Sequence, residues 1–279
     1  MTNRYDDPTT HPNYPFMQAE DVFYAVEIEV AIPFDNVDFA VGRYHHGLQV
    51  PHYPQGWKAE EDSSLQAPTL YRTLEIVSPK LKGFDGIVQL VQVLDDLAER
   101  EAIVNHSTGL HVHVDGRDLD IRDIKKLTQM FKQYEKLFFG VMGEQASTRY
   151  VNNSFCSPSE QWIDGREATD RYRSLNLKNW YNYEQKKTVE FRLFAGTLNP
   201  ETVITYVMMC VGLVVRARNC TRVHRFTKPP TTLPDLCKKF VQNVLSKKTN
   251  QIVPDYIPER SDSLFKVLYE NVPQSTVNL

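Results

Sequence analysis

Two carboxylates stand two residues apart in the otherwise apolar segment FYAVEIEV at residues 23–30. This composition predicts a strand, and side chains alternate along a strand, so Glu27 and Glu29 project from one face, ~7 Å apart. At an effective dielectric of about 20, their repulsion costs about 2 kcal/mol. Burial adds a desolvation cost unless a cation lies between them. The pattern therefore predicts a cationic partner on this face.

Three more segments have the same design, with polar residues on one face of a predicted strand and apolar residues on the other. TLEIV carries Glu75, GLHVHVD carries His111 and His113, and TVEFRLF carries Glu190 and Arg192. Each motif alone has an ordinary structural explanation: a solvated sheet face, an exposed or core histidine, or a surface ion pair. Their recurrence in four strands favours one shared site.

Carboxylate oxygens combined with imidazole suit Mg²⁺ or Mn²⁺ better than a structural zinc, which normally recruits thiolates. Mg²⁺ usually completes its coordination with water and substrate phosphates, which points to a nucleotide. Arg149, Arg171, Arg173 and Arg192 fall close to the predicted strands and could bind phosphate, although we expect Arg171 or Arg173 to be a solvated surface charge. The sequence has no P-loop, dinucleotide-binding glycine motif or GxSxG motif.

The remaining pattern predicts an α+β fold, in which an antiparallel (mixed) sheet has helices on one face and an open working surface on the other. Strands are expected at about 22–31, 71–77, 109–116, 171–180 and 188–196, with an irregular excursion over 33–70. Helices are expected at 84–101, 121–142, after Pro200 with Asn199 as N-cap, and near 233–246 and 261–271.

The length of 279 residues fits one large domain with an appendage. We expect a polar N-terminal segment over 1–21, a catalytic domain over 22–225 and a helical appendage over 226–279. A net charge of −3 gives no reason to expect nucleic acid or an anionic membrane as partner. Four scattered cysteines and a polar start indicate a cytoplasmic setting, and the apolar run Val203 to Val215 is too short to span a bilayer.

Six motifs together resemble the amidoligase family, carboxylate–amine ligases similar to the catalytic domains of glutamine synthetase and glutamate–cysteine ligase. They occur in the family's order over about residues 22–216: AVEIEV, GWKAEEDSSL, EIVSP, GLHVHVD, RYRSLNL and TVEFRLFAGTL. The sequence departs from the family pattern in having Ala25-Val26 where a glycine is usual before the first acidic strand, and DSS in place of DGS. It also has no β-grasp segment of the glutamine synthetase kind ahead of the first motif.

The resemblance implies ATP and two or three divalent ions, Mg²⁺ or Mn²⁺, bound across an open sheet. The implied metal ligands are Glu27, Glu29, Glu75, His111 and Glu190. His113 and Arg192 would contact phosphate or the acyl group, and Asp62 is a candidate base. Arg149, Arg173, Arg171 and Asn176 are the implied nucleotide contacts, while Trp57 and Asp62-Ser63-Ser64 would line the substrate side.

The implied activity is ATP-dependent amide formation through an acyl phosphate. The implied partners are small-molecule or peptide carboxylates and amines, and the sequence leaves the oligomeric state open. Two alternatives stay open at this point. One is a guanidino-type phosphotransferase on a similar sheet, and the other is a catalytically silent binding module, against which the cost of clustered buried carboxylates argues.

Overall fold

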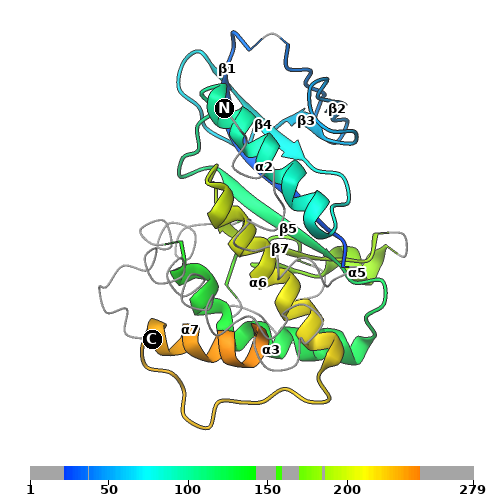
Figure 1. Cartoon of the computed structure of the whole chain (residues 1–279), viewed down its shortest axis with the longest axis vertical. Coiled ribbons are helices and arrows are strands. Elements are labelled where there is room, and N and C mark those ends of the chain that lie inside the picture. Colours follow the sequence, from blue (N-terminus) through cyan, green and yellow to red (C-terminus); the bar gives the residue numbers. More distant parts are fainter. Residues whose placement is uncertain (1–21, 37, 143–154, 159–169, 184–185, 246–279) are drawn as a thin grey trace.

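The computed structural model describes residues 22–36, 38–142, 155–158, 170–183 and 186–245. Its centre is a seven-stranded sheet in the order β2-β3-β4-β1-β5-β7-β6, with every pairing antiparallel. The strands are β1 (Tyr24–Pro33), β2 (Leu48–Gln49), β3 (Lys58–Glu61), β4 (Tyr71–Val77), β5 (Gly109–Asp115), β6 (Leu175–Asn176) and β7 (Thr188–Ala195). Figure 1 shows β5 and β7 in the middle of the molecule and β2, β3 and β4 above them.

The helices are α2 (Gly83–Glu99), α3 (Ile121–Gly140), α5 (Lys178–Asn182), α6 (Pro200–Asn219) and α7 (Leu233–Phe240), the last continued by a π-helical turn over Val241–Leu245. The predicted N-cap of α6 is confirmed, because the side chain of Asn199 accepts a hydrogen bond from the backbone N–H of Thr202. Asp120 and Asp123 form a capping box at the start of α3.

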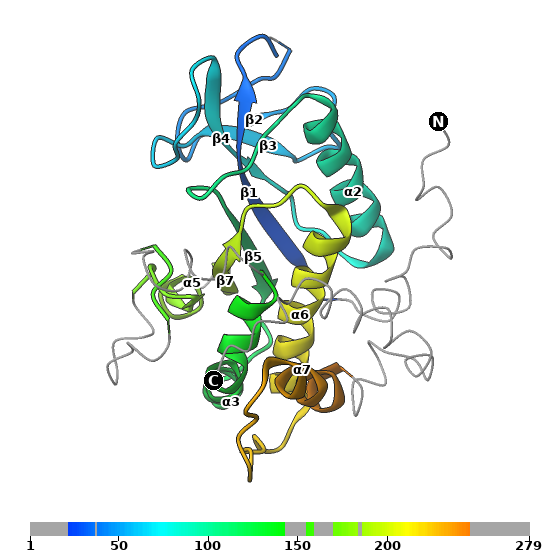
Figure 2. The same ribbon diagram turned by 90° about the vertical axis from the view of Figure 1, so that its left-hand side faces the viewer.

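The helices cover the apolar face of the sheet. Val26, Ile28 and Val30 of β1 are fully buried on this face, and Phe191 of β7 stacks with Phe138 of α3 at 6.0 Å between ring centroids. Figure 2 shows α2 and α6 together on one side of the sheet and the short α5 on the other. The predicted α+β fold with helices gathered on one face is therefore confirmed.

Helix α6 is longer than the apolar run within it. Its 20 residues would suffice to cross a membrane by length and composition, but 78% of its most apolar window is buried inside the protein. It packs against β5, α2 and α3. This burial is typical of the core helix of a globular domain. The helix is longer than the apolar run from Val203 to Val215, but it lies in the core, as predicted.

The predicted strands near 22–31, 71–77, 109–116 and 188–196 are confirmed as β1, β4, β5 and β7. The segment 171–180 is only partly a strand, because two residues pair as β6 and α5 begins at Lys178. The excursion over 33–70 contains the short strands β2 and β3 at one end of the sheet, which were not predicted. The expected helix at 261–271 lies outside the described residues, and the division into segments at 21 and 225 stays a prediction.

Candidate functional site

Strand register brings the polar residues into adjacent rows. Glu29 of β1 lies directly opposite Glu75 of β4, and Glu75 lies opposite Glu60 of β3 on its other side. Glu27 lies opposite His111 of β5. Cβ atoms of such pairs are about 4.5–5.5 Å apart, so carboxylates from three neighbouring strands and an imidazole from a fourth crowd one patch of the sheet.

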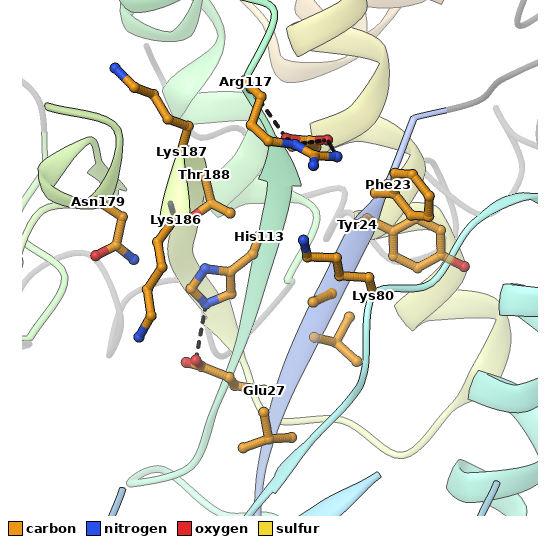
Figure 3. A pocket seen from close by; sticks show the side chains of 14 residues that line it. Phe23, Tyr24, Glu27, Lys80, His113, Arg117, Asn179, Lys186, Lys187 and Thr188 are labelled. Atoms are coloured by element: carbon orange, nitrogen blue, oxygen red, sulfur yellow. Dashed lines mark hydrogen bonds and ion pairs between the residues drawn. The ribbon is translucent and has the colours of Figure 1, made fainter. Parts of the chain in front are cut away.

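The two histidines of β5 contact the carboxylates of β1. The Nδ1 atom of His111 lies 3.0 Å from Glu27 Oε2, and its Nε2 atom lies 3.4 Å from Glu29 Oε1. The Nε2 atom of His113 lies 3.1 Å from Glu27 Oε1, the contact drawn in Figure 3. Glu29 also accepts a hydrogen bond from the backbone N–H of Gly109. Both histidines therefore face the carboxylates, as the alternation predicted.

The far side of the patch is organised around Glu190 of β7, which is almost fully buried and lies opposite His113 in the sheet. The side-chain amide of Asn176 donates to Glu190 Oε2 at 2.6 Å, and the guanidinium of Arg192 donates to Oε1. Arg192 Nε also donates to the backbone carbonyl of Phe155 at 3.3 Å. Asn176 and Arg192 thus fix the orientation of the Glu190 carboxylate.

Charge crowding shifts the pKa values of this patch. Burial, reinforced by Glu27, Glu29, Glu60 and Asp62, raises the pKa of Glu75 to about 10. Burial alone would raise the pKa of Glu27, but His113 and His111 outweigh it and hold the pKa well below its usual range. Burial likewise opposes the charged form of His113, yet Glu27 and Glu190 raise the pKa of its imidazole to about 9.

Two groups within the patch have the geometry of metal sites. Glu27, Glu75 and His111 form one group, and Glu27, His113 and Glu190 form the other. In each group, the candidate ligand atoms lie within 4.8 Å of one another. Carboxylate oxygens with one imidazole suit Mg²⁺ or Mn²⁺, and the excess of acidic over basic side chains around Glu75 supplies the negative charge such ions require. The donor set therefore fits divalent cations.

Glu60 is a candidate ligand that the sequence reasoning missed. It is buried, lies opposite Glu75, and accepts a hydrogen bond from the backbone N–H of His45 at 3.1 Å. A signal was present, because Glu60 and Asp62 repeat the two-residue spacing of Glu27 and Glu29. The surrounding segment is too polar to be recognised as a strand.

The role of the predicted substrate turn, Asp62-Ser63-Ser64, stays a prediction. Asp62 is buried near Glu75, and its Oδ1 accepts hydrogen bonds from the backbone N–H and the hydroxyl of Ser64 at 2.8 and 2.6 Å. Trp57 was predicted wrongly. It is fully buried in the core on the helix side, where its indole N–H donates to Gln89 of α2 at 3.3 Å. The large apolar indole of Trp57 is stabilised by burial in the core, where it does not line the substrate side.

The predicted phosphate-binding arginines differ in their surroundings. Arg171 is exposed and lies over the ring of Tyr172, 5.0 Å from its centroid. Arg173 forms an ion pair with Asp170 at 2.9 Å. Arg149 lies outside the described residues. Arg192 contacts Glu190, a predicted metal ligand, and the roles of the other three arginines stay predictions.

A pocket of about 260 Å³ opens beside Glu27 and His113 at one end of the patch. Figure 3 shows Lys80 and Arg117 on one part of its wall and Asn179, Lys186 and Lys187 on another. The apolar part of the lining comes from Phe23 to Val26 of the first strand segment and from Val77. The lysines and the arginine of this wall were not predicted from the sequence, because they lie in loops without a recognisable motif.

Comparison with known proteins gives a match to one family. Residues 36–164 and 144–214 match the model of the family described as "Putative amidoligase enzyme". No curated protein matches. Two solved structures are similar at a TM-score of 0.46 each: a structure titled "Crystal structure of novel glutamine synthase homolog", at 12% identity, and the Plasmodium falciparum glutamine synthetase, at 10% identity. Both alignments cover 90% of this chain, and they cover 66% and 72% of the other chains.

Proposed function

Because the chain belongs to the amidoligase family, we propose that it is an ATP-dependent carboxylate–amine ligase that forms an amide bond through an acyl phosphate. The observation that carries the proposal is the convergence of Glu27, Glu75 and Glu190 with His111 and His113 on one sheet face. The arrangement combines sites for divalent cations with a guanidinium and an imidazolium. Phosphoryl transfer is catalysed mainly by positioning and by positive charge around the transferred phosphate, which such a combination would supply.

The chemistry starts from an unreactive carboxylate, whose carbonyl is a poor electrophile and whose leaving group is worse. In the proposed reaction, a substrate carboxylate oxygen attacks the γ-phosphorus of ATP, and the bond from that phosphorus to the β,γ-bridging oxygen breaks, which releases ADP. An amine nitrogen then attacks the acyl carbon, the bond to the phosphate oxygen breaks, and the amine gives up a proton. The products are an amide, ADP and phosphate.

Glu27, Glu29, Glu75, His111 and Glu190 would hold the divalent ions, with Glu60 as an added candidate. Bound Mg²⁺ or Mn²⁺ ions would neutralise negative charge on the phosphate oxygens during transfer. The register of β3, β4, β1, β5 and β7 brings these side chains onto one face of the sheet. This arrangement supports a donor set that is assembled before any ligand binds.

Arg192 and His113 are proposed to stabilise the transferring phosphoryl group. Glu190 fixes the guanidinium of Arg192, and Asn176 fixes Glu190, so the cation is preorganised rather than mobile. Glu27 and Glu190 favour the charged imidazolium of His113, which supplies a second positive charge. Both groups would act on the phosphate and acyl oxygens where negative charge develops.

Asp62 is proposed as the base that accepts the proton of the amine. Its carboxylate is buried near Glu75, and Ser64 fixes one of its oxygens. The substrates are proposed to be a small-molecule or peptide carboxylate and an amine. Arg149, Arg171 and Arg173 are retained as proposed phosphate contacts.

The proposal predicts that ATP raises the unfolding temperature of the protein only when Mg²⁺ or Mn²⁺ is present, because a ligand that binds the folded state stabilises it. Glu27→Ala and Glu190→Ala should each abolish this shift, measured by differential scanning fluorimetry. Glu99→Ala, a change to an exposed carboxylate on α2 outside the two metal groups and outside the lining of the pocket, serves as the control for metal binding. A shift that survives in both glutamate variants would refute the metal assignment.

Product analysis separates the proposal from its alternatives. Pools of carboxylates and amines, incubated with the protein and Mg²⁺–ATP, should yield ADP and an amide detectable by mass spectrometry. ADP together with a phosphorylated amine or guanidine and no amide would favour the phosphotransferase. Tight binding of Mg²⁺–ATP without any turnover across the pools would favour the binding module.

A further inference from the structure

Two lysines stand on opposite walls of the pocket beside the metal groups. Lys80 follows β4, and Lys186 precedes β7, so they come from segments far apart in the sequence. Figure 3 shows them on either side of His113, above the Glu27 carboxylate. Both side chains are exposed, so each can reach a ligand in the pocket without losing buried contacts.

The backbone around Lys80 is held rigidly against β1. On one side of it, Ser78 exchanges hydrogen bonds with Val26, from its own N–H to the Val26 carbonyl at 3.0 Å and from the Val26 N–H to its hydroxyl at 2.8 Å. On the other side, Leu81 and Tyr24 exchange two backbone hydrogen bonds at 2.7 and 2.9 Å. The lysine therefore projects from a fixed point at the edge of the pocket rather than from a mobile loop.

The other basic residues of the pocket already have partners. Arg117 forms a bidentate ion pair with Asp115, with the closest contact at 2.6 Å. Lys187 lies over the ring of Trp180, 4.6 Å from its centroid. Within the part of the chain that the structure describes, Lys80 and Lys186 form no ion pair. These two lysines are thus the ones whose charge is available to a ligand.

The charge of the neighbouring patch explains why a ligand would need them. Six carboxyl groups lie in or next to it: Glu27, Glu29, Glu60, Asp62, Glu75 and Glu190. Two or three divalent ions would at most balance these carboxylates. A triphosphate brings several further negative charges at neutral pH, whereas Arg192 and His113 supply two side-chain cations that are already engaged by Glu190 and Glu27. The remaining phosphate charge requires other cations nearby.

We propose, on the premise of the function proposed above, that Lys80 and Lys186 bind the phosphate charge of the nucleotide from opposite walls of this pocket. Their role is to recognise phosphate rather than the base, since an ammonium group is a compact point charge that pairs with phosphate oxygens. The lysines contribute to nucleotide affinity and leave metal binding to the carboxylates.

The test compares wild type with Lys80→Ala, Lys186→Ala and the double variant. Isothermal titration calorimetry with Mn²⁺–ATP and with Mn²⁺–tripolyphosphate should show affinity lowered about 3- to 10-fold by each single change. The double variant should lose more affinity than either single variant. The factor of this loss should be the same for ATP and for tripolyphosphate. The loss should shrink as salt is raised, because exposed charges are screened. Binding of Mn²⁺ alone, followed by electron paramagnetic resonance, should be unchanged.

Lys82→Ala is the matched control, because Lys82 lies two residues from Lys80 but outside the pocket lining, with its ammonium over Phe23. It should bind both ligands like wild type. A double variant with wild-type affinity for Mn²⁺–ATP overturns the lysine assignment and leaves the proposed function intact. Weakened binding of ATP but not of tripolyphosphate also overturns it, because the lysines would then recognise the nucleoside. A wild-type protein that binds Mn²⁺ but not Mn²⁺–ATP overturns both proposals.

Discussion

Glu75 has Glu29 opposite it on one neighbouring strand and Glu60 opposite it on the other. Burial disfavours the charged form of its carboxyl group, and the neighbouring carboxylates repel that charge. Together they raise the pKa of Glu75 to about 10. A divalent ion bound between these carboxylates would have to expel the proton that Glu75 holds at neutral pH. Proton binding and metal binding at this position thus compete.

The metal-free protein should lose stability as the pH rises from 6.5 to 9. The pKa values of Glu75 and His113 are raised from 4.5 to about 10 and from 6.5 to about 9, so the folded protein retains protons that the unfolded chain releases. Each contribution is complete below the unfolded pKa of its group and is lost as the pH rises toward the folded pKa. The loss for Glu75 therefore begins near pH 4.5, and both groups lose stability together between pH 6.5 and 9, at up to about 1.4 kcal/mol per pH unit for each proton. Urea denaturation in the presence of a chelator measures the loss.

Glu75→Gln supplies the control for this pH dependence, because the amide cannot titrate. The variant should lose less stability than wild type over the same range and should release fewer protons when Mg²⁺ binds. Stability that rises with pH in the wild type, or an unchanged slope in the variant, would contradict the assignment of the raised pKa to Glu75.

Among the elements, β6 links the site to the helical layer behind the sheet. Just before β6, the hydroxyl of Ser174 donates to the carboxylate of Glu135 on α3, and both residues are buried. The carbonyl of Ser174 accepts the backbone N–H of Arg192. Two residues further, Asn176 fixes Glu190. The position of β6 thus depends on a buried carboxylate that the metal site does not use.

Ser174→Ala should lower the free energy of unfolding by about 1–3 kcal/mol, because it removes a hydrogen bond donor from a buried carboxylate. Urea denaturation at neutral pH measures the change. Thr128→Ala is the control, since the Thr128 hydroxyl donates only to the carbonyl of Ile124 on its own helix, and it should change stability by no more than about 0.5 kcal/mol. A serine variant as stable as this control would show that Glu135 does not anchor β6.

The sequence predicted which face of each long strand carries the polar residues, because period-two alternation in β1, β4, β5 and β7 is local information. It did not predict their register, which sets Glu29 beside Glu75 and His113 beside Glu190 and depends on pairing between distant segments. The strands β2 and β3 were missed because they are short and polar. Trp57 was misplaced because its side chain packs against α2, a contact that no local pattern encodes.

At the scale of the whole molecule, the two faces of the sheet differ in composition and surroundings. The apolar face packs on α2, α3 and α6 and was predictable from hydrophobic spacing. The polar face holds a patch of carboxylates next to a pocket with basic walls. This pocket was not predictable, because Lys80 and Lys186 are brought together only by the antiparallel order of the strands that they flank.

In the proposed ligase, imidazole and carboxylate groups from separate strands share divalent ions with a triphosphate. Pulsed electron–nuclear double resonance on Mn²⁺-loaded protein tests this arrangement most directly. We expect a nitrogen coupling from histidine that shifts with ¹⁵N-histidine labelling, and a phosphorus coupling that appears when ATP is added. Glu27→Ala should weaken both, because Glu27 belongs to both metal groups. Bound Mn²⁺ without nitrogen coupling, or bound ATP without phosphorus coupling, would contradict the account.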